Sequence, residues 1–165
     1  MKLTALWLAC VILLFAGLSA SHAAMRISDD RGGRIGVYLD KYQGLRTSGE
    51  TVIIDGYCAS ACTLVLGMVP RNKICVTPRA SLGFHAAWDP DASGHQVVNP
   101  GATRMLYAMY PSSVRRWIKA QGGLKTQLIL LRGEALMSMY RSCNLDMRTA
   151  EAGTRGATEL GSRPW

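Results

Sequence analysis

A serine and a histidine that could act together as nucleophile and base stand out in this sequence. Ser60 follows a β-branched run and precedes a segment of small and apolar residues of helical length, so we expect it at a turn from a strand into a helix. A hydroxyl in that place lies beside free backbone N–H groups, the donors that an acyl-transfer oxyanion needs. His85 ends a second predicted strand, and histidine is the usual base for a serine nucleophile. Strands that run to the same sheet edge would bring the two together.

Simpler roles for the same residues stay open. Serine is a common helix cap, so Ser60 can be a cap and His85 a structural residue. Gly32 and Gly33 lie between a predicted strand and a predicted helix. They form either a plain tight turn or a turn whose N–H groups point toward a ligand.

The elements that must position these residues alternate between strands and helices. We expect strands at residues 25–28, 51–54, 74–76 and 81–85. We expect helices at residues 35–48, 59–66, 101–120 and 124–143, and a loop at residues 88–94. Tyr110-Pro111 is expected to break the third helix. Buried strands that alternate with helices predict one small α/β domain.

Residues 1–24 have the composition of a secretory signal peptide. Lys2 precedes an apolar run at residues 5–18, and small residues around Ala23 offer a cleavage site. We therefore expect export to the periplasm or out of a bacterial cell, a folded domain over residues 25–147 and a disordered tail over residues 148–165. An uncleaved leader stays open as an alternative, and membrane attachment is expected only through such a leader.

Cysteine and charge limit the classes of function. The residues after the leader include Cys58, Cys62, Cys75 and Cys143. An exported chain favours disulfides, and four cysteines allow three pairings, among which the sequence does not choose. His85 and His95 form no second ligand cluster beside the cysteines, so neither a metal nor another cofactor is predicted. The net charge of +8 is scattered along the chain, which disfavours nucleic-acid binding.

Three short motifs follow one another along the chain. Residues 27–33 end in Gly-Gly, residues 55–62 contain Cys-Ala-Ser-Ala-Cys, and residues 80–85 end in His85. In their order and spacing they resemble the Clp protease proteolytic subunit of the Clp/crotonase superfamily, and most closely its predicted secreted bacterial branch. The resemblance implies a Clp/crotonase-like spiral of ββα units and a homo-oligomer. Because the predicted leader directly precedes the glycine motif, we expect the N-terminal unit of the spiral to be truncated.

The resemblance also assigns roles to residues. It implies that Ser60 is the nucleophile, that His85 is the general base, and that the substrate is a peptide, bound as an extra strand, or another acyl compound. The oxyanion donors would be backbone groups of Gly32, Gly33 and Ala61. Clp proteases orient the histidine with an acid, for which Glu134 and Asp89 are the candidates here. The sequence thus predicts a serine peptidase-like hydrolase, and leaves a non-catalytic binding or scaffold module as the alternative.

Overall fold

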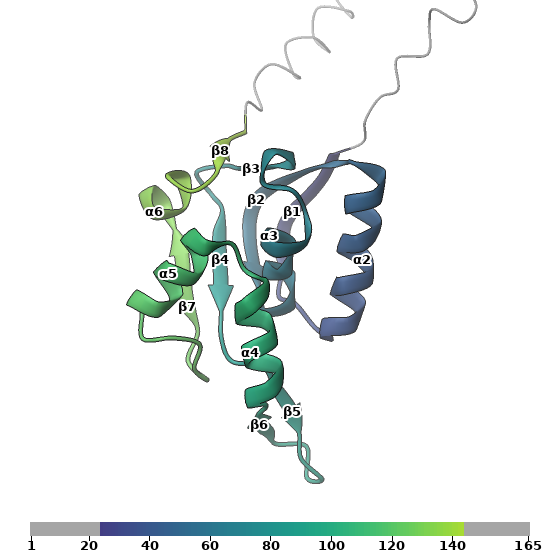
Figure 1. Ribbon diagram of the computed structural model, residues 1–165, viewed down its shortest axis with the longest axis vertical. Helices are drawn as coiled ribbons and strands as arrows, with labels where there is room; N and C mark the ends of the chain where they lie inside the picture. Colours follow the sequence, from purple (N-terminus) through teal and green to yellow (C-terminus); the bar gives the residue numbers. More distant parts are fainter. Residues whose placement is uncertain (1–23, 144–165) are drawn as a thin grey trace, which may run out of the picture.

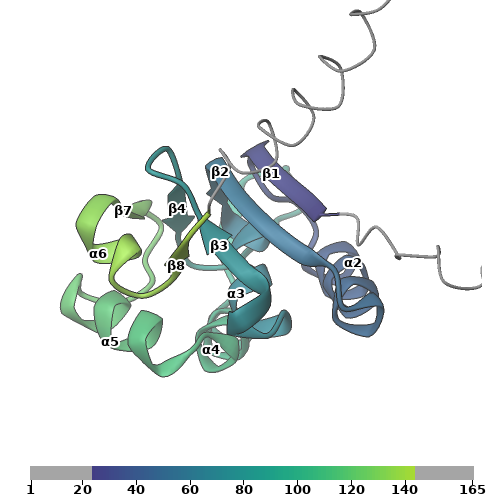
Figure 2. The same cartoon turned by 90° about the horizontal axis from the view of Figure 1, so that it is seen from above.

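The computed structural model describes residues 24–143. The predicted leader up to residue 23 and the predicted tail lie outside the described residues. Within them, one curled sheet carries helices on one side, and a small separate hairpin extends from one end of the domain (Figures 1 and 2). The expected small α/β domain is confirmed at this level.

The first strand and helix form where the sequence predicts them. β1 (Ala24–Asp30) leads through the glycine turn into α2 (Ile35–Ser48). Gly49 ends the helix in the left-handed conformation, with φ of 69°, and its N–H donates to the carbonyl of Leu45. Glycine has this role at many helix ends because it lacks the Cβ that opposes positive φ.

The second strand is longer than predicted. β2 (Thr51–Ala59) pairs in parallel with β1 and continues through Asp55-Gly56-Tyr57, where the expected strand over residues 51–54 would already have ended. Gly56 permits this continuation, because a Cβ there would lie 2.0 Å from the carbonyl oxygen of Ser28. The register of β1 with β2 shifts between Ile27 and Asp29, so the pairing of the two strands is locally irregular there.

The other edge of β2 has two partners. β3 (Ile74–Val76) pairs in parallel with residues 52–54, and β4 (Ser81–Phe84) pairs in parallel with residues 57–59. Two further strands extend these branches: β8 (Arg141–Ser142) runs parallel to β3, and β7 (Ile129–Arg132) runs antiparallel to β4. The sheet therefore divides beyond β2, and its two branches curl around a shared core.

The helical segments follow the prediction in part. The expected helix at residues 59–66 is a 3-10 helix, η1 (Ser60–Leu64), followed by the short α3 (Val65–Met68) and then by η2 (Arg71–Lys73). The predicted break at Tyr110-Pro111 is confirmed, since it separates α4 (Pro100–Met109) from α5 (Ser112–Ala120).

Two other expectations are wrong. Residues 124–143 do not form one helix but contain β7, α6 (Gly133–Met137) and β8. The apolar run in β7 alternates as a strand does, with Leu130 exposed and Leu131 buried against the core. The expected loop at residues 88–94 begins a hairpin of β5 (Trp88–Pro90) and β6 (Gln96–Val98), which forms without burying its side chains.

Two disulfides select one of the three pairings that the sequence left open. Cys58 bonds to Cys62 across η1, and Cys75 of β3 bonds to Cys143 after β8. These bonds are compatible with the expected export to an oxidising compartment. None of the helices within residues 24–143 combines the length and the apolar character that a membrane crossing requires.

Candidate functional site

Three parallel strands end at the same edge of the sheet. In the register of β1 with β2, Asp30 lies opposite Cys58, and in the register of β2 with β4, Ala59 lies opposite Gly83. The residues that follow these strands are therefore neighbours: the glycine turn on one side, Ser60 in the middle and His85 on the other side. The carboxyl ends of parallel strands are where α/β proteins commonly bind ligands.

The glycine turn packs directly on Ser60. Gly32 has a φ of 81°, and a Cβ there would lie 2.6 Å from the Cβ of Ser60 and 2.9 Å from the backbone nitrogen of Ala61. Its N–H donates to Oδ1 of Asp30 at 2.9 Å. Since that N–H is used within the turn, Gly33 is the member of the pair whose N–H makes no hydrogen bond in the described part of the chain.

Ser60 itself has an unusual backbone. Among residues 24–143 it is the one non-glycine residue with positive φ, at 57°. For an L-residue this conformation is disfavoured by about 1–2 kcal/mol, and such residues cluster at functional sites. The capping role is wrong: Ala59 occupies the N-cap position of η1, and no side chain makes a cap hydrogen bond there.

Buried hydroxyl groups hold the Ser60 turn in place. The Thr63 hydroxyl donates to the Ser60 carbonyl at 2.6 Å, so its oxygen accepts from the Tyr110 hydroxyl at 2.7 Å. The Tyr42 hydroxyl, from α2, donates to the Cys62 carbonyl at 2.8 Å. Sequence reasoning missed all three side chains, because the hydrogen bonds of Tyr42 and Tyr110 join residues far apart along the chain.

His85 is oriented by the backbone. Its Nδ1 lies 2.7 Å from the carbonyl oxygen of Ala86. A carbonyl only accepts, so Nδ1 carries the hydrogen and, in the neutral ring, Nε2 is left free to accept a proton. Neither acid named from the sequence bonds to this ring: Oδ2 of Asp89 accepts from Asn99, and Glu134 is exposed at the start of α6.

The two residues that follow His85 are both held in place by hydrogen bonds from their backbone N–H groups. The N–H of Ala86 donates to the carbonyl of Lys125 at 2.7 Å, and the N–H of Ala87 donates to the Thr103 hydroxyl at 3.0 Å. Because these partners come from α4 and from the chain after α5, two further elements fix where the histidine leaves the sheet.

A cleft of about 940 Å³ joins these groups. Its lining includes Ser60, Ala61, His85 and residues 31–36 of the glycine turn and the start of α2, together with residues of the β5–β6 hairpin and the end of α4. Ser60 and His85 make no hydrogen bond to each other among the described residues. The residues that line this one cleft thus include a serine, a histidine, and Gly33 and Ala61, whose backbones carry N–H groups.

In comparisons of sequence, no protein-family model matches the chain and no curated protein matches it. Within residues 24–143 no group of three or more His, Cys, Asp or Glu side chains is placed to hold a metal ion. The groups that line the cleft are those of acid–base and nucleophilic chemistry.

Proposed function

We propose that the protein is a serine hydrolase that acts on peptide or other acyl substrates. Ser60 is the nucleophile and His85 is the general base. The observation that carries the proposal is the parallel pairing of β2 with β4, which opens both residues into one cleft at one sheet edge. The positive φ of Ser60 supports it, since a strained turn from a strand into a helix exposes a nucleophile to substrate.

The chemistry assigns a step to each group. Nε2 of His85 takes the proton from Oγ of Ser60 as the oxygen attacks the acyl carbon, and the N–H groups of Gly33 and Ala61 donate to the oxyanion. His85 then returns the proton to the leaving group, and water releases the acyl group from Ser60 by the same route. Attack requires Oγ and Nε2 to approach to roughly 2.6–3.2 Å, a hydrogen bond that is often looser without substrate.

We also propose that the chain shares the fold of the Clp proteases that it resembles. The meeting of the three motifs around one cleft supports a Clp/crotonase-like fold, in which a peptide binds as an added strand and copies of the chain assemble. We propose as well that residues 1–24 are a signal peptide and that the protein is exported. An exported member would act without an ATP-driven partner, because ATP is not supplied outside the membrane, and the sequence itself holds no phosphate-binding loop of the Gly-x-x-x-x-Gly-Lys type.

A non-catalytic binding or scaffold module is the second candidate. One observation favours it: His85 is held by a carbonyl rather than by a carboxylate. Loss of the orienting acid lowers the rate of serine proteases by about 10⁴-fold. Here the carbonyl of Ala86 fixes the tautomer that general-base catalysis needs, although it adds no full charge beside the imidazolium.

Labelling with a fluorophosphonate, which reacts with activated serines, separates the two candidates. We expect the disulfide-bonded protein to be labelled, Ser60→Ala to abolish labelling, and His85→Ala to slow it about 10²-fold or more. Ser138→Ala, an exposed serine beyond α6, is the matched control and should label as the unmodified chain does. Absence of Ser60-dependent labelling, together with absence of ester and peptide hydrolysis, would reject the hydrolase and leave the binding module.

A further inference from the structure

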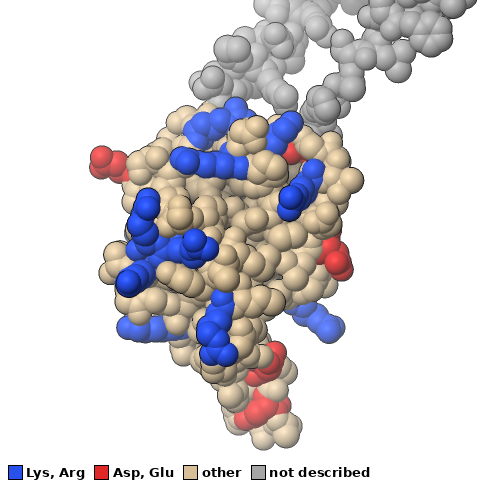
Figure 3. Space-filling view, in the orientation of Figure 1, with Lys and Arg blue, Asp and Glu red and all other residues tan. Residues whose placement is uncertain are grey.

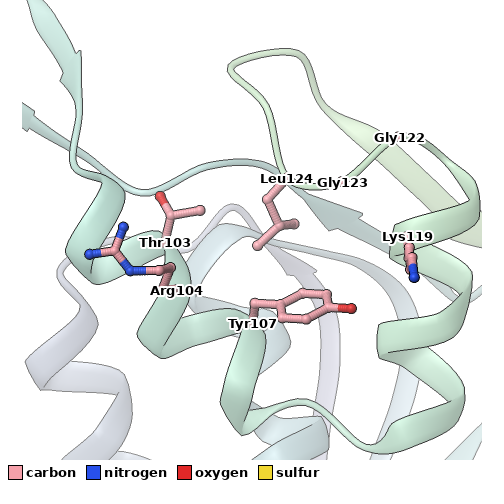
Figure 4. Close-up of a pocket in the computed structure, with 7 residues that line it drawn as sticks. All are labelled: Thr103, Arg104, Tyr107, Lys119, Gly122, Gly123 and Leu124. Atoms are coloured by element: carbon pink, nitrogen blue, oxygen red, sulfur yellow. The ribbon is translucent and has the colours of Figure 1, made fainter.

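A second hollow is separate from the cleft. It has a volume of about 570 Å³ and is bounded by α4, α5 and the turn that follows α5 (Figure 4). No residue lines both the hollow and the cleft. Its size falls in the range of small-molecule sites, which are about 300–1,000 Å³.

The middle of the hollow is apolar. In Figure 4 the Leu124 side chain points toward the ring of Tyr107. The Tyr107 hydroxyl donates to the carbonyl of Arg115 at 3.2 Å, which satisfies the polar end of this side chain. Leu124 and the Tyr107 ring therefore offer a ligand mainly apolar surface, whose burial favours binding.

Two cations lie at opposite ends of this apolar middle. Arg104 of α4 and Lys119 of α5 both line the hollow. In Figure 4 Leu124 and Tyr107 lie between these two residues, and the guanidinium of Arg104 is directed away from them, at the outer margin of the hollow. Both side chains are exposed, and neither forms an ion pair or a hydrogen bond with any other described residue. Both can therefore bind an anionic ligand without first giving up a partner within the chain.

The charge around the hollow favours an anion as well. On the face in Figure 3 basic side chains lie over several elements, while acidic side chains lie at the end that carries the β5–β6 hairpin and at the two side edges. Lys125 adds a third cation near the rim, because a Cβ at Gly122 would lie 3.1 Å from its Nζ. The hollow thus combines an apolar centre with cations at its margins.

We propose that this hollow binds a small amphipathic carboxylate, an aliphatic body with one acid group. The aliphatic body packs between Leu124 and Tyr107, and the carboxylate pairs with Arg104 or Lys119. The proposal does not depend on Ser60 chemistry, since none of these residues belongs to the cleft.

Octanoate is the probe that tests the site. Titration followed by the NMR signals of the Leu124 methyl groups should give a saturable shift, with a dissociation constant on the order of millimolar. Octanamide keeps the aliphatic body without the charge, and acetate keeps the charge without the body. Both should bind at least about tenfold more weakly if charge and apolar surface act together.

N-acetyl-leucine presents the same chemistry from a peptide source rather than from a fatty acid. Whichever of octanoate and N-acetyl-leucine binds more tightly supports the site and shows whether its ligand comes from a fatty acid or from a peptide.

Matched variants locate the charge. Arg104→Gln and Lys119→Gln should each weaken octanoate binding about threefold, and the double variant about tenfold, as expected for exposed ion pairs. Arg116→Gln removes an exposed cation of α5 outside the hollow and should change nothing. Octanamide binding as tightly as octanoate would overturn the proposal. So would an Arg116→Gln effect as large as that of the double variant, or the lack of a saturable Leu124 shift.

Discussion

Gly32 lies so close to Ser60 that a Cβ on the glycine would stand 2.6 Å from the Cβ of the serine. Only backbone fits between the end of β1 and the turn after β2, and the positive φ of Gly32 is a second reason for glycine there. The glycine pair and the serine thus form one structural unit, although a complete helix separates them in the sequence.

Gly32→Ala should therefore disrupt the candidate site. The added methyl group would also approach the carbonyl oxygen of Ala59, at 2.5 Å, so β1 or the Ser60 turn must move. We expect a loss of about 1–3 kcal/mol in the free energy of unfolding, measured by urea denaturation, and loss of Ser60 labelling.

Gly44→Ala is the control for this change. Gly44 lies in α2 with open space around its Cα and does not line the cleft, so alanine there should stabilise the protein by about 0.5–1 kcal/mol and leave labelling unchanged. Equal effects of the two substitutions would show that the close approach of Gly32 to Ser60 does not matter.

The sequence could predict the candidate site because each of its parts is a local pattern. A β-branched run, a glycine pair and a strand that ends in histidine are visible without knowledge of the fold, and parallel pairing of β1, β2 and β4 aligns their ends. Whether Ser60 reacts is not a local property. We expect it to depend on Thr63, Tyr110 and the Ala86 carbonyl, whose hydrogen bonds are set by the whole structure.

The fold was least predictable where short apolar runs fit either a helix or a strand. Residues 128–131 are all apolar, and residues 129–132 form a strand because β4 offers an unpaired edge. The hairpin at residues 88–98 has no such tertiary partner strand and follows from local pairing across a turn. Disulfide pairing was open for the same reason, since it depends on the parallel register of β3 with β8.

The backbone strain at Ser60 can be measured. Ser60→Gly should give a more stable protein than Ser60→Ala, by about 1 kcal/mol, because glycine adopts positive φ without a Cβ clash. At Ser138, whose φ is −72°, the order should reverse, with glycine about 0.5–1 kcal/mol less stable than alanine. Urea denaturation of the four variants tests this. The same order at both positions would mean that Ser60 is not strained.

The two disulfides should differ in their effect on stability. Cys75 and Cys143 are separated by 68 positions, and Cys58 and Cys62 by only 4. A disulfide that closes a longer loop restricts the unfolded chain more, which predicts stabilisation of about 4 kcal/mol for the first bond and about 2 kcal/mol for the second.

Double substitutions to alanine, followed by thermal or urea unfolding, test this order. Removal of the Cys58–Cys62 bond should also slow labelling of Ser60, which lies inside its ring. The variant that lacks the Cys75–Cys143 bond should retain that labelling under conditions in which it is folded. A larger loss of stability from the short bond would contradict the prediction.

Asp55 should make stability depend on pH. Burial alone would raise the pKa of this carboxyl, but hydrogen bonds from Arg79, Thr77 and Arg26 outweigh it and lower the pKa from 3.8 to about 2. The folded protein thus binds this proton less readily than the unfolded chain does. The stability that Asp55 supplies is complete above pH 3.8 and is lost as the pH falls toward about 2.

Asp55→Asn should therefore lower stability at neutral pH by about 1–3 kcal/mol, and by less as the pH approaches 2. Asp40→Asn removes an exposed carboxylate of α2 and serves as the control. Denaturation measured from pH 7 to pH 2 gives the comparison. A deficit of Asp55→Asn that stays constant over this range would mean that the ionised carboxylate has no special role.

The chain of hydroxyls from Tyr110 through Thr63 to the Ser60 carbonyl should position Ser60, the proposed nucleophile. Thr63→Val keeps the shape of the side chain but leaves the Tyr110 hydroxyl and the Ser60 carbonyl without their partner. We expect a loss of about 1–3 kcal/mol in stability and slower labelling of Ser60. Thr63→Ser retains the hydroxyl and should keep the labelling rate despite the lost methyl group.

The double variant Thr63→Val/Tyr110→Phe separates positioning from packing. Removing the second hydroxyl leaves no unpaired phenol in the interior, so part of the stability should return. The Ser60 carbonyl still lacks its donor, so labelling should stay slow. If labelling recovers together with stability, Thr63 acts only through packing, and the hydroxyl chain does not hold Ser60 for reaction.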